Sequence, residues 1–360
     1  MSGELRLGAR TIGAGRPVFV VAELSANHLG RLDRARRIVE AAAAAGADAI
    51  KLQTYRPETM TLPIAAPPFV IGGDGPWAGR TLFDLYEEAQ TPWEWHRELR
   101  DLAADLGLVF FSTPFDETAV ELLEELEVPV YKVASFELVD LPLLARVAAT
   151  GKPVILSTGM AGAGEIEEAL DTLRRHGAGD VALLKCTSAY PAPPEEMNLR
   201  SIPALAERFG TAVGLSDHTL GWTVPVAAVA LGASIVEKHL TLARADGGPD
   251  AAFSLEPDEL RAMVEALRTV DRALGSPRFG PTRAETASLP FRRSLFTVRP
   301  VAAGEELTAE NVRPIRPGNG LAPRHLREVL GRRAARDLPA GTPLSWDLVG
   351  VSSGPPAPPR

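Results

Sequence analysis

The sequence predicts an α/β fold, a (β/α)₈ barrel followed by a small, turn-rich β domain. Eight short β-branched runs alternate with longer amphipathic segments, which is the pattern of βα units around a parallel sheet. These units span about 275 residues, the usual size of such a barrel. After residue 290, short runs separated by Gly and Pro turns replace the helical periodicity. An open doubly wound sheet is the alternative that the alternation by itself also allows.

The eight β-branched runs are expected to form the strands of the barrel. In chain order they are 18–22, 49–52, 108–111, 130–133, 154–156, 181–184, 212–215 and 234–236. The segments between them are expected to be helices, since several begin at Asp, Pro or Glu and end at Gly. Clear examples are 32–46, 92–107, 116–127 and 164–177.

The chain is expected to divide into a barrel domain over 1–275, a linker over 276–290, a β domain over 291–349 and a disordered tail over 350–360. One long excursion, 56–92, follows the second predicted strand and contains several prolines, glycines and aromatic residues. A βα loop of this length is expected to cover the active-site face of the barrel.

Composition and charge exclude several classes of function. The net charge of −8 disfavours a nucleic-acid or anionic-membrane partner, although a locally basic pocket can still hold an anionic small molecule. The single cysteine, Cys186, excludes an intrachain disulfide and a thiolate zinc cluster, which fits the reducing cytoplasm. The N-terminal segment has no apolar core typical of a signal peptide, and no run is apolar enough to span a membrane.

Polar side chains follow every predicted strand, at the end where catalytic residues of barrels are found. A single Ser or Thr in such a place is usually a helix cap or a turn residue. Eight polar strand ends together would leave many buried hydrogen-bonding groups to satisfy, so a ligand-filled mouth is the better interpretation. The segments are AELSANH, IKLQT, FSTPF, YKVASFE, LSTGM, LKCTSAYP, LSDH and EKH.

Two histidines, His218 and His239, end the seventh and eighth strands, which are neighbours in the predicted barrel. Each one alone is more often a hydrogen-bonded structural group than a metal ligand. On adjacent strand ends they are close enough to bind one catalytic divalent ion, with positions left for water or substrate. Nitrogen and oxygen ligands suit Mn²⁺, Fe²⁺, Co²⁺ or Zn²⁺.

A second group of strand-end residues predicts an anion site. Lys51, Lys132, Ser135 and Ser157 combine cationic and neutral donors suited to a phosphate and a carboxylate. The structural alternative is a buried ion pair of Lys51 and Lys132 with Glu23 or Glu137. Glu23 is a candidate acid or base near the metal, and a supporting partner of a histidine or lysine is an equally good interpretation of its position.

These strand-end motifs, together with GGPDAAFS and the RPGNG of the last domain, resemble the sialic acid (nonulosonic acid) synthase family over most of the chain. The resemblance implies condensation of phosphoenolpyruvate with an amino sugar on a (β/α)₈ barrel, and a C-terminal antifreeze-like (SAF) domain. WAGRTLFDLYEEAQTPWEWH, LKCTSAYPAP and ADGGPDAAFS are most similar to the pseudaminic acid synthases, whose sugar is 2,4-diacetamido-2,4,6-trideoxy-altrose.

The same resemblance implies roles for particular residues. His218 and His239 would bind the metal, usually Mn²⁺, and with Glu23 they form the expected catalytic set. The residues expected to hold phosphoenolpyruvate are Lys51, Thr113, Lys132, Ser135, Ser157, Ser188 and Ser216. Those expected to face the sugar are Gln53, Glu137, Tyr190 and Asp250. Arg316 of RPGNG would reach the substrate of the partner in a domain-swapped homodimer.

Three other functions remain open at this point. N-acetylneuraminate or legionaminate synthesis would differ only in the sugar. A Schiff-base aldolase is a different enzyme class, since lysines inside barrels often form imines. A non-enzymatic binding or ice-interacting role of the last domain would leave the crowded strand ends without a purpose.

Overall fold

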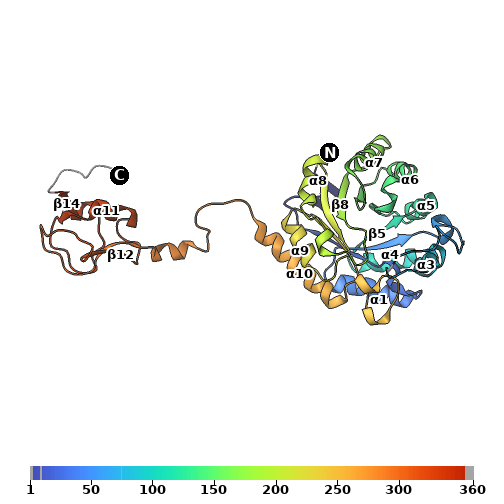
Figure 1. Ribbon diagram of the computed structural model, residues 1–360, viewed down its shortest axis with the longest axis horizontal. Coiled ribbons are helices and arrows are strands. Elements are labelled where there is room, and N and C mark those ends of the chain that lie inside the picture. Colours follow the sequence, from blue (N-terminus) through green and yellow to red (C-terminus); the bar gives the residue numbers. More distant parts are fainter. Residues whose placement is uncertain (1–2, 9, 74, 353–360) are drawn as a thin grey trace. The chain divides into compact units, whose positions relative to one another are not determined.

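The computed structural model describes residues 3–8, 10–73 and 75–352, and the chain divides into two compact units, Met1–Gly275 and Ser276–Arg360. The first unit contains a closed barrel in which eight parallel strands follow one another in chain order and the last pairs with the first (Figure 1). The second unit contains short antiparallel strand pairs. The predicted fold class is therefore confirmed, and the open-sheet alternative is excluded.

All eight predicted runs are strands of the barrel. Their bounds are β3 Phe19–Glu23, β4 Ala49–Thr54, β5 Val109–Pro114, β6 Tyr131–Val133, β7 Val154–Ser157, β8 Val181–Cys186, β9 Ala212–Asp217 and β10 Ile235–His239. Most of them continue past the apolar run into the polar residues that follow it. The polar strand ends are thus part of the sheet, which holds their backbones rigidly.

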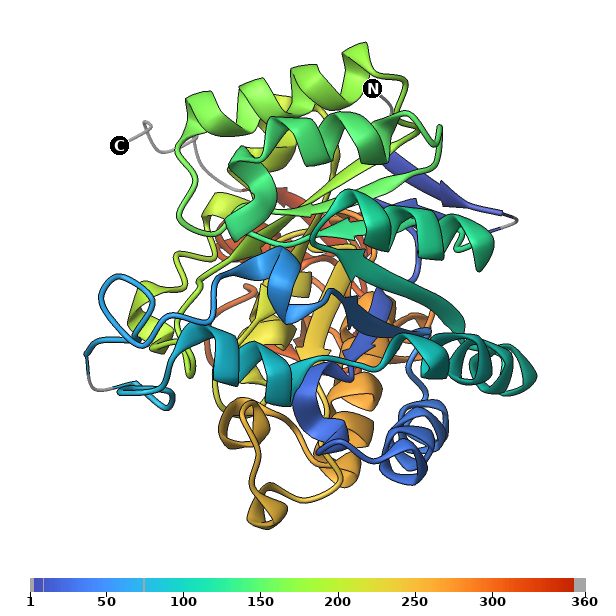
Figure 2. The ribbon, with the colours of Figure 1, turned by 90° about the vertical axis from the view of Figure 1, so that its right-hand side faces the viewer.

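Helices surround the strands on the outside (Figure 2). The outer helices are α1 Leu32–Ala44, α4 His96–Asp105, α5 Glu117–Glu125, α6 Leu141–Ala148, α7 Ala163–Arg175, α8 Ser201–Phe209, α9 Thr223–Ala230 and α10 Pro257–Leu274. Side-chain caps fix some of their starts, as where the Asp116 carboxylate accepts from the backbone N–H of Thr118 and Ala119 at α5. Within the part of the chain that the structure describes, no helix has the length and apolarity needed to cross a membrane.

Strand alternation sorts each strand's side chains into two cores. On β3, Val20 and Ala22 face outward into the cluster shared with the helices. Phe19 and Val21 belong to a separate cluster inside the barrel, so Glu23 is the next inward position, toward the carboxyl end of the strand. The barrel interior is therefore apolar toward the amino ends of the strands and polar at their carboxyl ends, where the barrel opens.

An N-terminal hairpin closes the lower end of the barrel, and sequence reasoning missed it. It consists of β1 Glu4–Leu7 and β2 Arg10–Gly13, which pair antiparallel. Leu5, Leu7 and Ile12 are buried in the interior cluster of the barrel. The two strands are only four residues long, which makes their alternation too short to read from sequence.

The excursion after β4 has structure of its own. It contains two helices, α2 Pro57–Met60 and α3 Leu82–Ala89. Between them, Val70 and Thr81 form an antiparallel bridge, and the hydroxyl of Thr81 also accepts from Asp84 N at the start of α3. These bonds hold the excursion in one conformation, so it can form a wall of the active site.

The second unit is a small β domain with its own core, as predicted. Strand β11 Ser294–Thr297 pairs with β12 Val312–Ile315, and β13 Arg332–Ala334 pairs with β14 Val349–Ser352. Its core residues include Leu295, Leu307, Val329, Leu344 and Leu348. The prediction of a disordered tail from residue 350 was wrong at its start, because 350–352 belong to β14 and pair with β13. Residues 353–360 of that predicted tail lie outside the described residues.

Candidate active site

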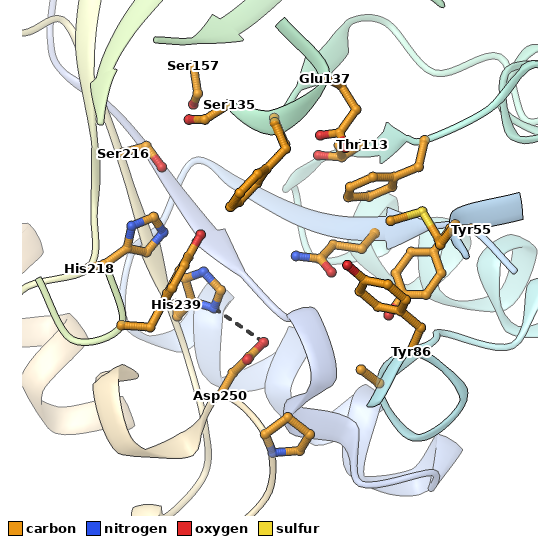
Figure 3. A pocket seen from close by; sticks show the side chains of 18 of the residues that line it. Tyr55, Tyr86, Thr113, Ser135, Glu137, Ser157, Ser216, His218, His239 and Asp250 are labelled. Atoms are coloured by element: carbon orange, nitrogen blue, oxygen red, sulfur yellow. Dashed lines mark ion pairs between the residues drawn. The ribbon is translucent and has the colours of Figure 1, made fainter. Parts of the chain in front are cut away.

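The carboxyl ends of the barrel strands open into a cavity of about 470 Å³ (Figure 3). Twelve of the fifteen residues that the sequence predicts for the site line it. They are Lys51, Gln53, Thr113, Lys132, Ser135, Glu137, Ser157, Tyr190, Ser216, His218, His239 and Asp250. The fold therefore brings together side chains that are up to about two hundred residues apart, as expected for a barrel mouth.

Strand alternation explains why these side chains converge. Ser216 and His218 are two residues apart, and so are Glu237 and His239, so each pair lies on the same side of its strand. Both pairs point into the barrel, above the apolar interior. The intervening Lys238 points outward and forms a buried ion pair of 2.6 Å with Asp217 on the neighbouring strand.

A buried cluster of lysines and carboxylates forms the floor of the cavity. Lys51 Nζ contacts the Glu23 carboxylate, lies 3.8 Å from Glu237 Oε1 and donates to Thr113 Oγ1 at 3.2 Å. Lys132 Nζ lies 3.8 Å from the same oxygen of Glu237. The structural alternative that paired the lysines with buried carboxylates is thus correct for Glu23, whereas Glu237 and not Glu137 is the second carboxylate of the cluster.

The electrostatics of this cluster favour an anionic ligand. Burial raises the pKa of Glu23 to about 7, although Lys51 opposes the rise. Burial alone would raise the pKa of Glu237, but Lys132 and Lys51 outweigh it and lower that pKa. Near neutral pH, the two lysines therefore face one ionised carboxylate and one that is partly protonated, while burial lowers the pKa of Lys132. A substrate phosphate or carboxylate would stabilise the ammonium form of both lysines.

The two predicted metal ligands lie side by side in the wall of the cavity, at the ends of neighbouring strands. The ring centroids of His218 and His239 are 5.4 Å apart. His218 Nδ1 is 3.0 Å from the backbone oxygen of Thr187, so we assign the proton to Nδ1, which donates to that oxygen and leaves the lone pair of Nε2 free for a metal. Burial, followed by the charge of His218, lowers the pKa of His239 well below its usual value, so its ring is neutral.

These two imidazoles fit a divalent cation with two protein ligands. His239 Nδ1 is buried without a hydrogen-bond partner among the described residues, and it lies 3.9 Å from an oxygen of Asp250. A neutral imidazole with an unsatisfied ring nitrogen is suited to metal coordination. No group of three or more His, Cys, Asp or Glu in the described ranges has the geometry to hold a metal alone. The remaining positions would therefore go to water or substrate.

Serine hydroxyls line the side of the cavity near β7. Ser135 Oγ accepts from the backbone N–H of Gly159 at 3.0 Å. Ser157 Oγ is buried and has no hydrogen-bond partner within the described part of the chain. A Cβ atom on Gly159 would lie 2.4 Å from Ser188 Oγ and 2.7 Å from Ser135 Oγ, so a larger residue there would displace these two hydroxyls. The unpaired hydroxyl of Ser157 is a donor available to a ligand.

The excursion after β4 supplies an apolar wall, which supports its predicted role in covering the site. Met60, Trp77, Leu85 and Tyr86 from this segment line the cavity. Trp77 Nε1 donates to the backbone oxygen of Pro249 at 2.9 Å, which ties the segment to the loop after β10.

Three predicted residues do not line the cavity. Glu23 is fully buried beneath it in contact with Lys51, so the structure favours the supporting role over direct contact with substrate. Ser188 is half-buried beside the lining residue Cys186, with its Oγ 3.9 Å from Cys186 Sγ. Arg316 belongs to the second unit, where it lines a separate pocket together with Arg292 and Arg293.

Sequence reasoning missed several lining residues that strand alternation would have found. Tyr55 follows Lys51 and Gln53 at a spacing of two, and Glu237 precedes His239 at the same spacing. The excursion residues Trp77 and Tyr86 carry no such periodic signal, because their position depends on how the loop folds back.

Comparison with known proteins identifies the family. Residues 38–278 match the NeuB family, and residues 292–350 match the SAF domain. The chain is 46% identical over 334 residues to the pseudaminic acid synthase of Helicobacter pylori, covering 92% of this chain and 98% of that protein. It is 35% identical to the N,N'-diacetyllegionaminic acid synthase of Legionella pneumophila, over 95% of this chain and 97% of that protein.

A solved structure agrees with these sequence matches. The N-acetylneuraminic acid (sialic acid) synthetase of Leptospira borgpetersenii, in complex with citrate, superposes with a TM-score of 0.72 at 34% identity. The match covers 80% of this chain and 96% of that chain. The chain is therefore an enzyme that belongs to the NeuB family and carries a C-terminal SAF domain.

Proposed function

We propose that this enzyme is a nonulosonic acid synthase that condenses phosphoenolpyruvate with 2,4-diacetamido-2,4,6-trideoxy-altrose and water, giving pseudaminic acid and phosphate. The observation that carries the proposal is the juxtaposition, in one cavity, of the Lys51 and Lys132 ammonium groups with the facing rings of His218 and His239. The identity of 46% to a pseudaminic acid synthase, against 35% to a legionaminic acid synthase, supports this choice of sugar.

The lysine and serine side of the cavity suits phosphoenolpyruvate. Lys51 and Lys132 supply the charge that its phosphate and carboxylate require, and Thr113, Ser157 and Ser216 add neutral donors. The anion would stabilise the ammonium form of Lys132, whose pKa burial lowers. Bound there, C3 of phosphoenolpyruvate would face the two imidazoles.

The reaction balances without an oxidant or reductant. C3 of phosphoenolpyruvate forms a bond to the aldehyde carbon of the open-chain sugar, and a water oxygen bonds to C2. The bond between C2 and the phosphate oxygen then breaks, which leaves a ketone at C2. Of the two water protons, one goes to the former aldehyde oxygen and the other leaves with phosphate. Lys51 and Lys132 would stabilise charge that develops around C2.

A divalent cation, which we propose to be Mn²⁺, would be held by His218 and His239 and would supply Lewis-acid polarisation of the sugar aldehyde when bound. The protein itself keeps His239 neutral by burial and orients His218 through Thr187. Gln53, Tyr190 and Asp250 would orient the sugar, and the Tyr190 ring packs 4.5 Å from that of His218. These contacts would hold the aldehyde next to the nucleophile.

We also propose a domain-swapped homodimer in which Arg316 of one protomer reaches the sugar in the other. Exposed apolar residues on the loops of the barrel mouth support a covering partner, among them Phe136, Val139, Met160 and Leu220. Arg316 lies beside Arg292 and Arg293, which makes that part of the second unit cationic. The substitution Arg316→Ala is expected to lower activity while the protein stays dimeric. Analytical ultracentrifugation would measure the oligomeric state.

The test is phosphate release from phosphoenolpyruvate with Mn²⁺, comparing 2,4-diacetamido-2,4,6-trideoxy-altrose with N-acetylmannosamine and with the diacetamido precursor of legionaminate. Each sugar is assayed with and without a chelator. Metal-dependent release with the altrose sugar alone is expected. Release with one of the other sugars instead would keep the condensation and overturn the choice of sugar. Trapping of a pyruvate imine by borohydride would instead support the Schiff-base aldolase.

A further inference from the structure

The two sides of the cavity differ in chemistry. His218, His239 and Asp250 lie on one side, and Tyr55, Tyr86 and Glu137 lie on the other (Figure 3). The second side also includes other apolar residues of the cavity wall. We call it the apolar side and define it by Tyr55, Met60, Leu85, Tyr86 and Phe115.

Aromatic rings pack together on the apolar side. The ring of Tyr55 meets the rings of Tyr86 and Phe115 edge to face, at centroid distances of 5.7 Å and 5.3 Å. Tyr55 is only 2% exposed, so this packing extends beneath the wall. A sugar hydroxyl held against this surface would lose its water without gaining a partner, whereas a methyl group would gain from burial.

One carboxylate interrupts the apolar side. Glu137 Oε2 is buried and has no hydrogen-bond partner among the residues that the structure describes. The nearby Lys132 ammonium pairs instead with Glu237, at 3.8 Å. Burial raises the pKa of Glu137 to about 7, which Lys132 only partly opposes. A buried acceptor without a donor is costly, so its retention in the wall of a cavity points to a donor on the ligand.

The geometry of the reaction decides which part of the sugar reaches this side. If the proposed function holds, the aldehyde carbon C1 lies at His218 and His239. The C2 substituent then stays near the imidazoles, while C4 and C6 are three and five bonds farther along the chain. The far end of the sugar therefore meets the apolar side.

We propose that the apolar side, with Glu137, is a subsite for an acylamino group at C4 of the sugar. The amide N–H donates to the Glu137 carboxylate, and the acyl methyl and the C6 methyl pack against Tyr86 and Phe115. This inference rests on the proposed function and adds a specificity determinant to it. An acylamino group is the substituent that offers both a donor and a methyl at one position.

The experiment separates the N–H from the acyl group by substrate design. Phosphate release is measured with 2,4-diacetamido-2,4,6-trideoxy-altrose and with its isostere 2-acetamido-4-O-acetyl-2,6-dideoxy-altrose, in which an ester oxygen replaces the C4 N–H. Wild type is expected to prefer the amide by about 10- to 100-fold in kcat/KM. In Glu137→Met this preference falls to within about threefold. Glu137→Gln, which keeps an oxygen acceptor, restores part of it.

Controls keep the outcomes distinct. Glu125→Met on the exposed face of α5 should leave the preference unchanged. Glu137→Met removes an unpaired carboxylate, so its thermal midpoint should equal or exceed that of wild type. An unchanged amide preference in folded Glu137→Met overturns the subsite alone. If wild type releases no phosphate with the diacetamido sugar, the proposed function fails and the subsite fails with it.

Discussion

His218 and His239 face each other at the ends of neighbouring strands, with ring centroids 5.4 Å apart and ring planes inclined by 59°. The parallel pairing of β9 with β10 produces this relationship, because it places Asp217 opposite Lys238 and so brings the next residue of each strand together. The two side chains then share one side of the barrel wall. A site built in this way depends on the sheet rather than on a flexible loop.

Substitution His239→Ala is expected to lower kcat/KM by about three orders of magnitude, since Lewis-acid activation contributes several kcal/mol to the transition state. His176→Ala is the matched control, because His176 is exposed at the end of α7. Thermal unfolding should show both variants folded. The wild-type enzyme should lose turnover in buffer that contains a chelator and regain it when Mn²⁺ is added. Full turnover in the chelator, with no increase on adding Mn²⁺, would contradict a metal role for the histidine pair.

Lys51 is expected to have separable roles in stability and in binding. Lys51→Met leaves the Glu23 carboxylate buried without its partner, which should cost about 3–5 kcal/mol in unfolding free energy. The double variant Lys51→Met, Glu23→Gln should recover most of this stability in urea unfolding. Its kcat/KM for phosphoenolpyruvate should nevertheless stay about 100-fold low, because the ammonium group is still absent. Recovery of activity in the double variant would show that Lys51 acts only as a structural partner.

Two buried hydroxyls that have no hydrogen-bond partner within the described ranges provide a paired test of the anion site. Ser157 Oγ faces the cavity, whereas Thr211 Oγ1 lies just before β9, at the opposite end of the strand from the cavity. Neither Ser157→Ala nor Thr211→Val should lower the thermal midpoint, since no protein hydrogen bond is lost. Only Ser157→Ala should raise the KM for phosphoenolpyruvate, by about tenfold. Equal KM values in the two variants would remove Ser157 from the binding site.

Glu137 should make the stability of the unliganded enzyme depend on pH. Burial raises its pKa from 4.5 to about 7, so the folded state binds a proton more tightly than the unfolded state does. The stability that this proton provides is present below pH 4.5 and is lost as the pH rises through 7. Glu137→Gln should therefore gain roughly 1–3 kcal/mol relative to wild type between pH 4.5 and pH 8. Urea unfolding at both pH values measures the difference.

The exposed carboxylate Glu125 is the reference for that measurement. Glu125→Gln should shift the unfolding free energy by the same small amount at both pH values. A gain for Glu137→Gln that is equally large at pH 4.5 would mean that packing, and not the ionisation of Glu137, limits stability.

The sequence by itself determined the order of strands and helices, the small second unit and most of the cavity residues. Short-range periodicity carries this information, because apolar runs mark strands and a parallel barrel brings all their carboxyl ends to one mouth. His218 and His239 were predictable as a pair for the same reason, as were Lys51 and Lys132.

Only the tertiary structure decided which strand-end groups face the cavity and which support it. Glu23 and Glu237 are both carboxylates at strand ends, yet Glu23 is buried against Lys51 while Glu237 reaches the cavity wall. Trp77 and Tyr86 enter the site because a long loop folds back, and the hairpin around Leu5 closes the barrel from a distant part of the chain. Such contacts depend on packing between segments far apart in sequence, which local periodicity does not encode.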